Sequence, residues 1–134
     1  MTNQDLPKVI KLVSHVDERG AFIELLKKAS LPKTQFGQLS ITTIEPKQQK
    51  GNHYHKIRWE WFYIIEGDVE IELIKVTTKK RKKLSISSKN PSLISIPPYW
   101  NHILFNKSTH KATAVVYSSI EYMKNKPDVY YLDK

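Results

Sequence analysis

Short apolar segments separated by turn residues run through most of this 134-residue chain, and they constrain its fold more than any other feature. Roughly ten such segments recur, with turn residues about every 8–12 positions. No long stretch has the 3.6-residue periodicity of a helix, which argues against helix-turn-helix DNA binding. The pattern predicts an all-β sandwich or barrel, formed as one domain over residues 1–134.

The segment over residues 61–65 is the most strand-like, because its residues are aromatic or β-branched. Residues 66–68 (EGD) then predict a hairpin turn, and residues 69–76 predict its return strand. Residues 46–51 are predicted to form a polar loop. Further strands are predicted over residues 9–13, 38–45, 84–87, 93–96, 103–105 and 112–118.

The formal net charge of +9 comes largely from one place. Residues 79–83 (KKRKK) supply five positive charges, at the position of a hairpin tip. No aromatic residue interleaves this run, so a solvated tip is favoured over a nucleic-acid surface. No apolar run approaches ~18 residues and the start lacks the order of a signal peptide, so we expect a cytoplasmic protein without a membrane partner.

The chain contains no cysteine, so any metal ion must be held by histidine and carboxylate side chains. His53 and His55 are two residues apart, and on a strand such side chains point to the same face. Glu60 follows five residues later, and His102 lies beyond a Pro-Pro turn. An isolated His-x-His pair often lies on the protein surface without binding a metal. These four residues together, however, form a suitable ligand set for Zn²⁺, Fe²⁺, Mn²⁺ or Ni²⁺.

Two spacings carry a family resemblance. His-x-His-x4-Glu-x6-Gly runs from His53 to Gly67, and Pro-x3-His-x3-Asn runs from Pro98 to Asn106. Both resemble the motifs of the cupin superfamily, although Lys47 and Tyr99 stand where cupins usually carry glycine. The resemblance implies a single-domain cupin (RmlC-like jelly-roll) β-barrel.

Residues 51–56, 96–106 and 126–130 further resemble the C-terminal cupin domain of bifunctional capsular-polysaccharide enzymes of the CapF type. In that family a reductase domain is coupled to a cupin that epimerises C3 of a UDP-4-keto-hexose. The resemblance implies a zinc ion on His53, His55, Glu60 and His102. It also implies a nucleotide-sugar epimerase or isomerase of surface polysaccharide biosynthesis that acts by enolisation.

Three alternatives stay open. A metal-free sugar 3,4-ketoisomerase would use His53 and His55 directly as bases. A cupin dioxygenase would use the same four ligands with Fe²⁺. A sugar-binding cupin would keep the pocket without turnover.

If a metal binds, the base must come from elsewhere, and the titratable residues nearby in sequence are Tyr54, Lys56, Tyr63 and Tyr117. For substrate binding, Arg19 suits a phosphate, with a turn salt bridge to Asp17 or Glu18 as the alternative. Trp100 and Trp59 could stack on the base or the sugar ring, although core or interface packing is the commoner role of Trp. Tyr117 completes the candidate substrate contacts, and His15 and His110 are predicted to be surface residues.

Strand alternation places Glu60 and Phe62 inward, and therefore Trp59, Trp61 and Tyr63 outward. Three aromatic side chains on the outer face of a strand would make an apolar patch. A homodimer formed through that sheet is therefore predicted.

Overall fold

The chain is described by a computed structural model over residues 6–32 and 35–133. The strands are short and follow one another closely. They are β1 (Lys8–Lys11), β2 (Ser14–Asp17), β3 (Gly20–Ile23), β4 (Gln38–Ile44), β5 (Gln49–His53), β6 (Glu60–Glu66), β7 (Asp68–Lys75), β8 (Arg81–Ser87), β9 (Ser92–Ile96), β10 (Trp100–Phe105) and β11 (Ala112–Ser118), with one 3₁₀ turn, η1 (Lys28–Ser30).

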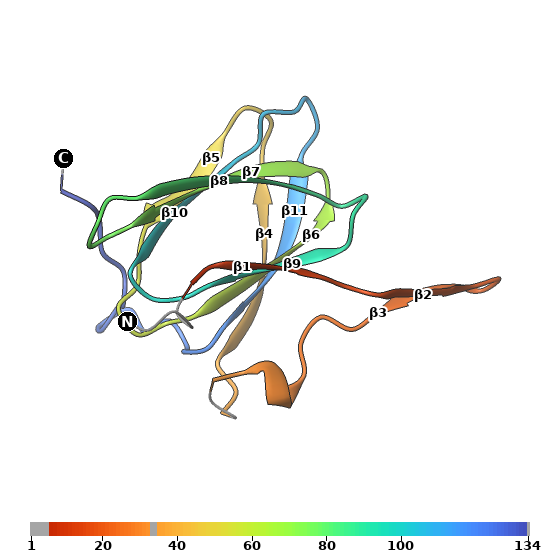
Figure 1. Cartoon of the computed structure of the whole chain (residues 1–134), viewed down its shortest axis with the longest axis horizontal. Coiled ribbons are helices and arrows are strands. Elements are labelled where there is room, and N and C mark those ends of the chain that lie inside the picture. Colours follow the sequence, from red (N-terminus) through yellow and green to blue (C-terminus); the bar gives the residue numbers. More distant parts are fainter. Residues whose placement is uncertain (1–5, 33–34, 134) are drawn as a thin grey trace.

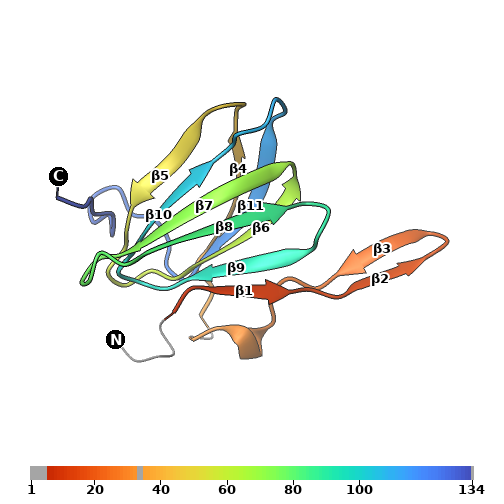
Figure 2. The same cartoon turned by 45° about the horizontal axis from the view of Figure 1, so that its top comes forward.

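Two antiparallel sheets face each other (Figures 1 and 2). One sheet has the order β1-β9-β6-β11-β4, and the other has the order β5-β10-β7-β8. The chain passes repeatedly from one sheet to the other between β5 and β11, as in a jelly roll. The predicted all-β cupin fold is therefore confirmed. Among the described residues, no helix is long and apolar enough to cross a membrane.

The apolar core lies between the two sheets and is built by strand alternation. Phe62 and Ile64 point inward from β6, and Ile71 and Leu73 point inward from β7 with no exposed surface at the latter two. Burying side chains of this size stabilises the fold by about 1.5–3 kcal/mol each. The core therefore holds β6, which carries Glu60, in a fixed place.

The predicted hairpin at residues 66–68 is wrong. β6 pairs with β9 and β11, whereas β7 pairs with β8 and β10, so Gly67 connects the two sheets rather than two paired strands. Gly67 has φ +98°, and a Cβ atom there would lie 2.9 Å from the Cα of Ala112. The tight crossing therefore needs glycine. The predicted loop at 46–51 is also too long, because β5 already begins at Gln49.

At both positions where the sequence lacks a cupin glycine, the backbone still adopts a conformation that glycine favours. Lys47 has φ 65° and Tyr99 has φ 66°, in the left-handed region. This region costs a non-glycine residue about 1–2 kcal/mol. The surrounding fold therefore imposes these turns on side chains that do not favour them.

The facing of the aromatic residues on β6 is confirmed, but the predicted exposed patch is wrong. Trp61 is only 3% exposed and packs with Leu93 and Tyr117 on the outer face of the sheet. Leu25 and Leu26, from the segment between β3 and β4, pack against this cluster. The chain itself therefore covers the surface that was predicted to form a dimer.

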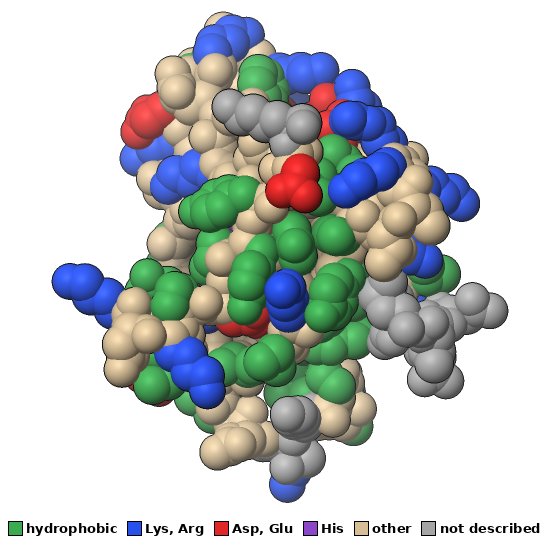
Figure 3. Space-filling model, turned by 90° about the vertical axis from the view of Figure 1, so that its left-hand side faces the viewer, with side chains coloured by type: hydrophobic (Ala, Val, Ile, Leu, Met, Phe, Trp, Pro, Cys, Tyr) green, Lys and Arg blue, Asp and Glu red, His purple; other side chains and the backbone are tan. Residues whose placement is uncertain are grey.

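The basic run begins in the turn between β7 and β8, as predicted, and continues into β8. Arg81 forms an ion pair with Glu72 at 3.1 Å, and its side chain stays mostly exposed. On the left-hand side of Figure 1, seen face on in Figure 3, hydrophobic side chains gather in the middle of the surface and Lys and Arg lie around them. Positive charge is therefore mixed with apolar surface on this face.

Candidate metal centre

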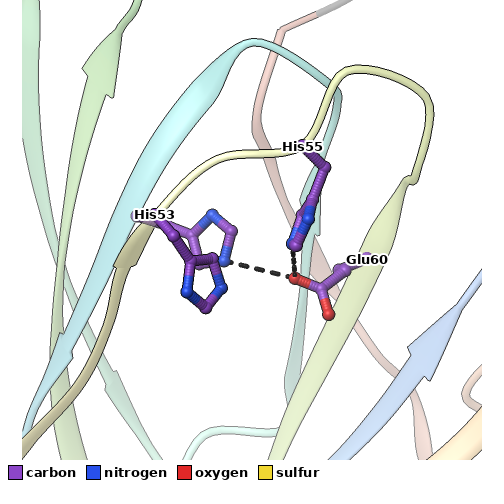
Figure 4. Close-up of side chains that lie close together, drawn as sticks. His53, His55 and Glu60 are labelled. Carbon is purple, nitrogen blue, oxygen red and sulfur yellow. Dashed lines mark hydrogen bonds and ion pairs between the residues drawn. The ribbon is translucent and has the colours of Figure 1, made fainter. Parts of the chain in front are cut away.

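Four predicted ligands gather at one place in the barrel. His53 comes from the end of β5, His55 from the loop that follows, Glu60 from the start of β6 and His102 from β10. One nitrogen or oxygen atom from each residue lies within 4.8 Å of all the others. Figure 4 shows His53, His55 and Glu60 pointing toward one another. The arrangement predicted from spacing is present.

The two buried imidazoles, those of His55 and His102, use their ring nitrogens in the same way. The Nδ1 atom of His55 lies 2.5 Å from the carbonyl oxygen of Asp128, and that of His102 lies 3.2 Å from the carbonyl oxygen of Trp100. A carbonyl oxygen only accepts, so both Nδ1 atoms carry the hydrogen. Both Nε2 atoms then face the same Oε1 atom of Glu60, at 2.9 and 3.2 Å.

This donor set fits a divalent cation. In the neutral form, the Nε2 atoms of His55 and His102 present lone pairs toward the carboxylate oxygen of Glu60, and these three atoms repel one another. Protons on the Nε2 atoms or a cation among the three atoms remove the repulsion. Imidazole Nε2 atoms held from behind by a carbonyl, together with a carboxylate, are typical ligands of zinc and related metals.

Glu60 is held in its charged form. Burial raises the pKa of this carboxyl. When His102 and His55 carry protons on Nε2 as well, their hydrogen bonds to Glu60 outweigh burial and keep this pKa well below its usual value. The second oxygen, Oε2, accepts a hydrogen bond from Ser118 Oγ at 3.2 Å. Ser118 was missed in the sequence, because only the β6–β11 register places it opposite Glu60.

His53 is the least constrained of the three imidazoles. Its ring centroid lies 4.9 Å from that of His102 and 5.1 Å from that of His55, and no hydrogen bond joins it to another described residue. Burial, followed by the neighbouring charges of His102 and His55, lowers the pKa of His53 to about 4. A neutral imidazole at physiological pH is free to bind a metal or to accept a proton.

The lowered pKa of His53 predicts a pH dependence of stability in the metal-free protein. The unfolded chain binds this proton near pH 6.5, whereas the folded chain binds it only near pH 4. Protonation therefore favours the unfolded chain, and the free energy of unfolding is highest above pH 6.5 and falls as the pH drops toward 4. We expect the free energy of unfolding to fall by about 1–2 kcal/mol over this range. The fall is smaller than the full pKa difference implies, because solvent reaches part of the ring. Urea unfolding between pH 4 and 7 measures this loss.

His53→Gln should flatten the dependence in that window. His15→Gln is the matched control, because His15 is exposed on β2. Equal pH slopes for wild type and His53→Gln would contradict the assignment to His53.

A cavity of about 330 Å³ contains three of the four cluster residues, His53, Glu60 and His102. Thr42 lines it from β4 and Lys50 from β5, and the Nζ atom of Lys50 donates to Thr42 Oγ1 across the gap at 3.1 Å. Two larger cavities, of about 630 and 610 Å³, have none of these four residues in their walls. The smaller cavity is therefore the candidate substrate pocket.

Lys50 is a pocket residue that sequence reasoning missed. Strand alternation from His53 would point Lys50 to the opposite face. The register between β5 and β10 shifts, however, so that His53 pairs with His102 while Gly51 pairs with Ile103. This bulge at Asn52, which has φ 63°, resets the alternation and brings Lys50 to the pocket.

The structure does not bring Tyr54 and Lys56 to the cavity. The ring of Tyr54 stacks on that of Tyr130 at 5.7 Å, and the Nζ atom of Lys56 lies 4.2 Å from the centre of the same ring. Neither residue lines the pocket. Both were predicted as catalytic, and both instead contact the C-terminal segment.

The predicted substrate contacts also lie elsewhere. Trp100 is buried in the core between the sheets. Tyr117 packs on the outer face of its sheet, and its hydroxyl accepts a hydrogen bond from the backbone of Gly37. Arg19 forms an ion pair with Asp17 at 2.7 Å in the turn of the β2–β3 hairpin, so the salt-bridge alternative is the one observed. Tyr63 faces outward with Tyr117.

Most of this chain matches a known protein family. The sequence profile described as "Polysaccharide biosynthesis C-terminal domain" matches residues 15–130. The chain belongs to this family. The predicted resemblance to the C-terminal domain of capsular-polysaccharide enzymes is thereby confirmed, and the matched region contains all four candidate metal ligands.

Two relatives of this chain differ in length. A UDP-2-acetamido-2,6-beta-L-arabino-hexul-4-ose reductase from Pseudomonas aeruginosa is 27% identical over 116 residues, which are 87% of this chain and 30% of that protein. The spore coat polysaccharide biosynthesis protein SpsL from Bacillus subtilis is 26% identical over 126 residues, 90% of this chain and 83% of SpsL. The chain therefore spans under a third of that reductase but most of SpsL.

Solved structures share the fold. The capsular polysaccharide assembling protein CapF from Staphylococcus aureus superposes with a TM-score of 0.71 at 27% identity, over 92% of this chain and 34% of CapF. QdtA, a sugar 3,4-ketoisomerase from Thermoanaerobacterium thermosaccharolyticum in complex with TDP, has a TM-score of 0.74 at 20% identity, over 92% of this chain and 85% of QdtA. At that lower identity, the second likeness shows the fold alone.

Proposed function

We propose that this protein is a nucleotide-sugar epimerase or isomerase that acts on a 4-keto hexose in polysaccharide biosynthesis. The observation that carries the proposal is the His53–His55–Glu60–His102 cluster, part of which lines a cavity of about 330 Å³, within the range of small-molecule pockets. The names of the relatives support the substrate class, since one specifies a UDP-linked hexul-4-ose and another a coat polysaccharide.

The chemistry of a 4-keto sugar matches what this pocket holds. The protons on the carbons beside the ketone are acidic, and removal of one gives an enolate. Return of a proton to the other face inverts the carbon, so the site needs a proton acceptor and a means of stabilising the oxyanion. A divalent cation held by the four cluster residues would polarise the carbonyl oxygen and stabilise that negative charge.

The residue that accepts the proton depends on whether His53 binds a metal. With His53 engaged as a ligand, Lys50 is the other titratable side chain in the cavity wall that can hold a proton beside the sugar. With His53 free, its neutral imidazole is the base. The free imidazole favours a second candidate function, a metal-free sugar 3,4-ketoisomerase, for which QdtA provides a structural counterpart.

Metal analysis of protein purified without added metal discriminates between the two functions. Zinc at one ion per chain supports the epimerase, and absence of metal with retained activity supports the ketoisomerase. Iron would instead favour an oxygenase. Solvent deuterium appearing beside the ketone of a UDP- or dTDP-4-keto hexose would support either isomerase, and its absence with both sugars would sink the proposal.

We also propose that the protein is a homodimer formed through the β2–β3 hairpin. This hairpin projects from the barrel (Figures 1 and 2), and Val16 and Phe22 on it are 73% and 62% exposed. A two-stranded hairpin is marginally stable alone in water. The edge strand β4 exposes Leu39 and Ile41 in the same way, so a second copy offers apolar surface to the hairpin.

Phe22→Asp should weaken the dimer by at least about tenfold, because a carboxylate would be buried in an apolar contact. Light scattering over a range of micromolar concentrations measures the dissociation. Tyr131→Asp is the control, since Tyr131 is exposed on the C-terminal segment, which lies on the opposite side of the molecule from the hairpin in Figures 1 and 2. A wild-type protein that is monomeric at these concentrations would refute the dimer.

A further inference from the structure

The C-terminal segment that follows β11 is fastened to the loop that carries His55. The carboxylate of Asp128 accepts hydrogen bonds from three successive backbone N–H groups: Lys56 to Oδ1 at 2.9 Å, and Ile57 and Arg58 to Oδ2 at 2.9 and 2.8 Å. Hydrogen bonds to a charged acceptor are shorter and stronger than those to a neutral one. This single carboxylate therefore holds the backbone of three of the four residues between His55 and β6.

A second set of contacts fixes the same segment on the other side of His55. Tyr54 and Tyr130 exchange two backbone hydrogen bonds, each 2.9 Å long. Their rings stack, and Lys56 covers the ring of Tyr130. Both views in Figures 1 and 2 show the C-terminal segment beside one end of β5. The backbone on both sides of His55 is therefore held by hydrogen bonds, to Asp128 on one side and to Tyr130 on the other.

The segment also touches the imidazole itself. The carbonyl oxygen of Asp128 lies 2.5 Å from Nδ1 of His55 and accepts its hydrogen. The hydrogen is thereby kept on Nδ1, and Nε2 is left to face Oε1 of Glu60 at 2.9 Å. The side-chain carboxylate of Asp128 places this carbonyl, because both belong to the same residue.

We propose that Asp128 is a positioning residue of the metal centre, which selects Nε2 of His55 as the atom that binds a divalent cation. The inference rests on the proposed function only for the identity of the bound group. Carbonyl partners behind a ligating histidine fix its tautomer and ring orientation, and their loss costs about 10–100-fold in metal affinity. The C-terminal segment is therefore part of the site, although it contributes no ligand.

Asp128→Asn tests the inference with little change of shape. An amide has one accepting oxygen and turns its NH₂ group toward backbone N–H donors, so the loop over residues 56–58 loses at least one of its three bonds. We expect zinc affinity, measured by calorimetry, to fall by about 10–100-fold. We also expect ¹⁵N NMR of the metal-free protein at pH 8 to show His55 as a mixture of tautomers, where the wild type shows one.

Asp133→Asn is the matched control, because Asp133 is an exposed carboxylate on the same segment. Asp128→Ser is the second variant, to be used if Asp128→Asn does not fold. A folded variant with the wild-type tautomer would overturn the inference, as would one with wild-type zinc affinity. If the wild type binds no zinc, the metal proposal fails, and the tautomer measurement still decides whether Asp128 positions His55.

Discussion

Replacing Glu60 with Gln is expected to abolish tight zinc binding and to slow solvent-deuterium exchange into a 4-keto nucleotide sugar by about 10³-fold or more. The cluster's only carboxylate supplies the charge that attracts a cation, and Gln removes that charge while keeping the shape. Loss of the polarising group would cost several kcal/mol of transition-state stabilisation, and about 4 kcal/mol corresponds to a factor of 10³.

Stability should respond in the opposite way to activity. The amide of Gln can donate a hydrogen to the Nε2 lone pair of His55 or His102, where the carboxylate of Glu60 requires a proton or a cation. We therefore expect the metal-free Glu60→Gln protein to melt at or above the wild-type temperature. Glu66→Gln, at the exposed end of β6, is the control. Wild-type metal content and exchange in Glu60→Gln would contradict this account of the site.

Replacing Lys50 with Met is expected to weaken binding of UDP or dTDP by about 10–100-fold. Lys50 lines the pocket, and its ammonium contacts Thr42 but forms no ion pair with any described carboxylate. A charge-assisted hydrogen bond to a phosphate oxygen is worth about 1.5–3 kcal/mol, and about 1.4 kcal/mol corresponds to a tenfold change in affinity. Calorimetry with the nucleotides alone measures the loss.

Lys89→Met controls for the loss of a charge from this basic protein, because Lys89 is exposed in the turn between β8 and β9. We expect that variant to bind nucleotide with wild-type affinity. Equal losses in Lys50→Met and Lys89→Met would show that overall charge, and not a contact at the pocket, governs binding.

The all-β class was predictable because it depends on short-range spacing. The four candidate ligands were predictable because they stand in two spaced motifs of a known family. Residues 112–118 form a strand with the predicted bounds, and His53, Glu60 and His102 meet as expected. Alternation along β6 also predicted correctly that Phe62 points into the core and Trp61 points to the outer face of the sheet. These features need only the two-residue period of a strand and a known motif.

The failures arise where the fold breaks local rules. The β5 bulge brings Lys50 into the pocket, and the sheet crossing at Gly67 replaces the predicted hairpin. Tyr117 was assigned to the substrate from its neighbourhood in sequence, but its strand turns it outward. Asp128 lies 73 residues from His55, so nothing local could show that they touch.

The central claim is that this pocket enolises a nucleotide-linked 4-keto hexose, and solvent-deuterium incorporation tests it most directly. The wild-type protein, with one equivalent of zinc and without, is incubated in D₂O with UDP- or dTDP-4-keto hexose, and the sugar is read by NMR. We predict deuterium on a carbon beside the ketone, lost in Glu60→Gln and kept in Glu66→Gln. No deuterium above the rate without protein, for either sugar and with or without zinc, would contradict the claim.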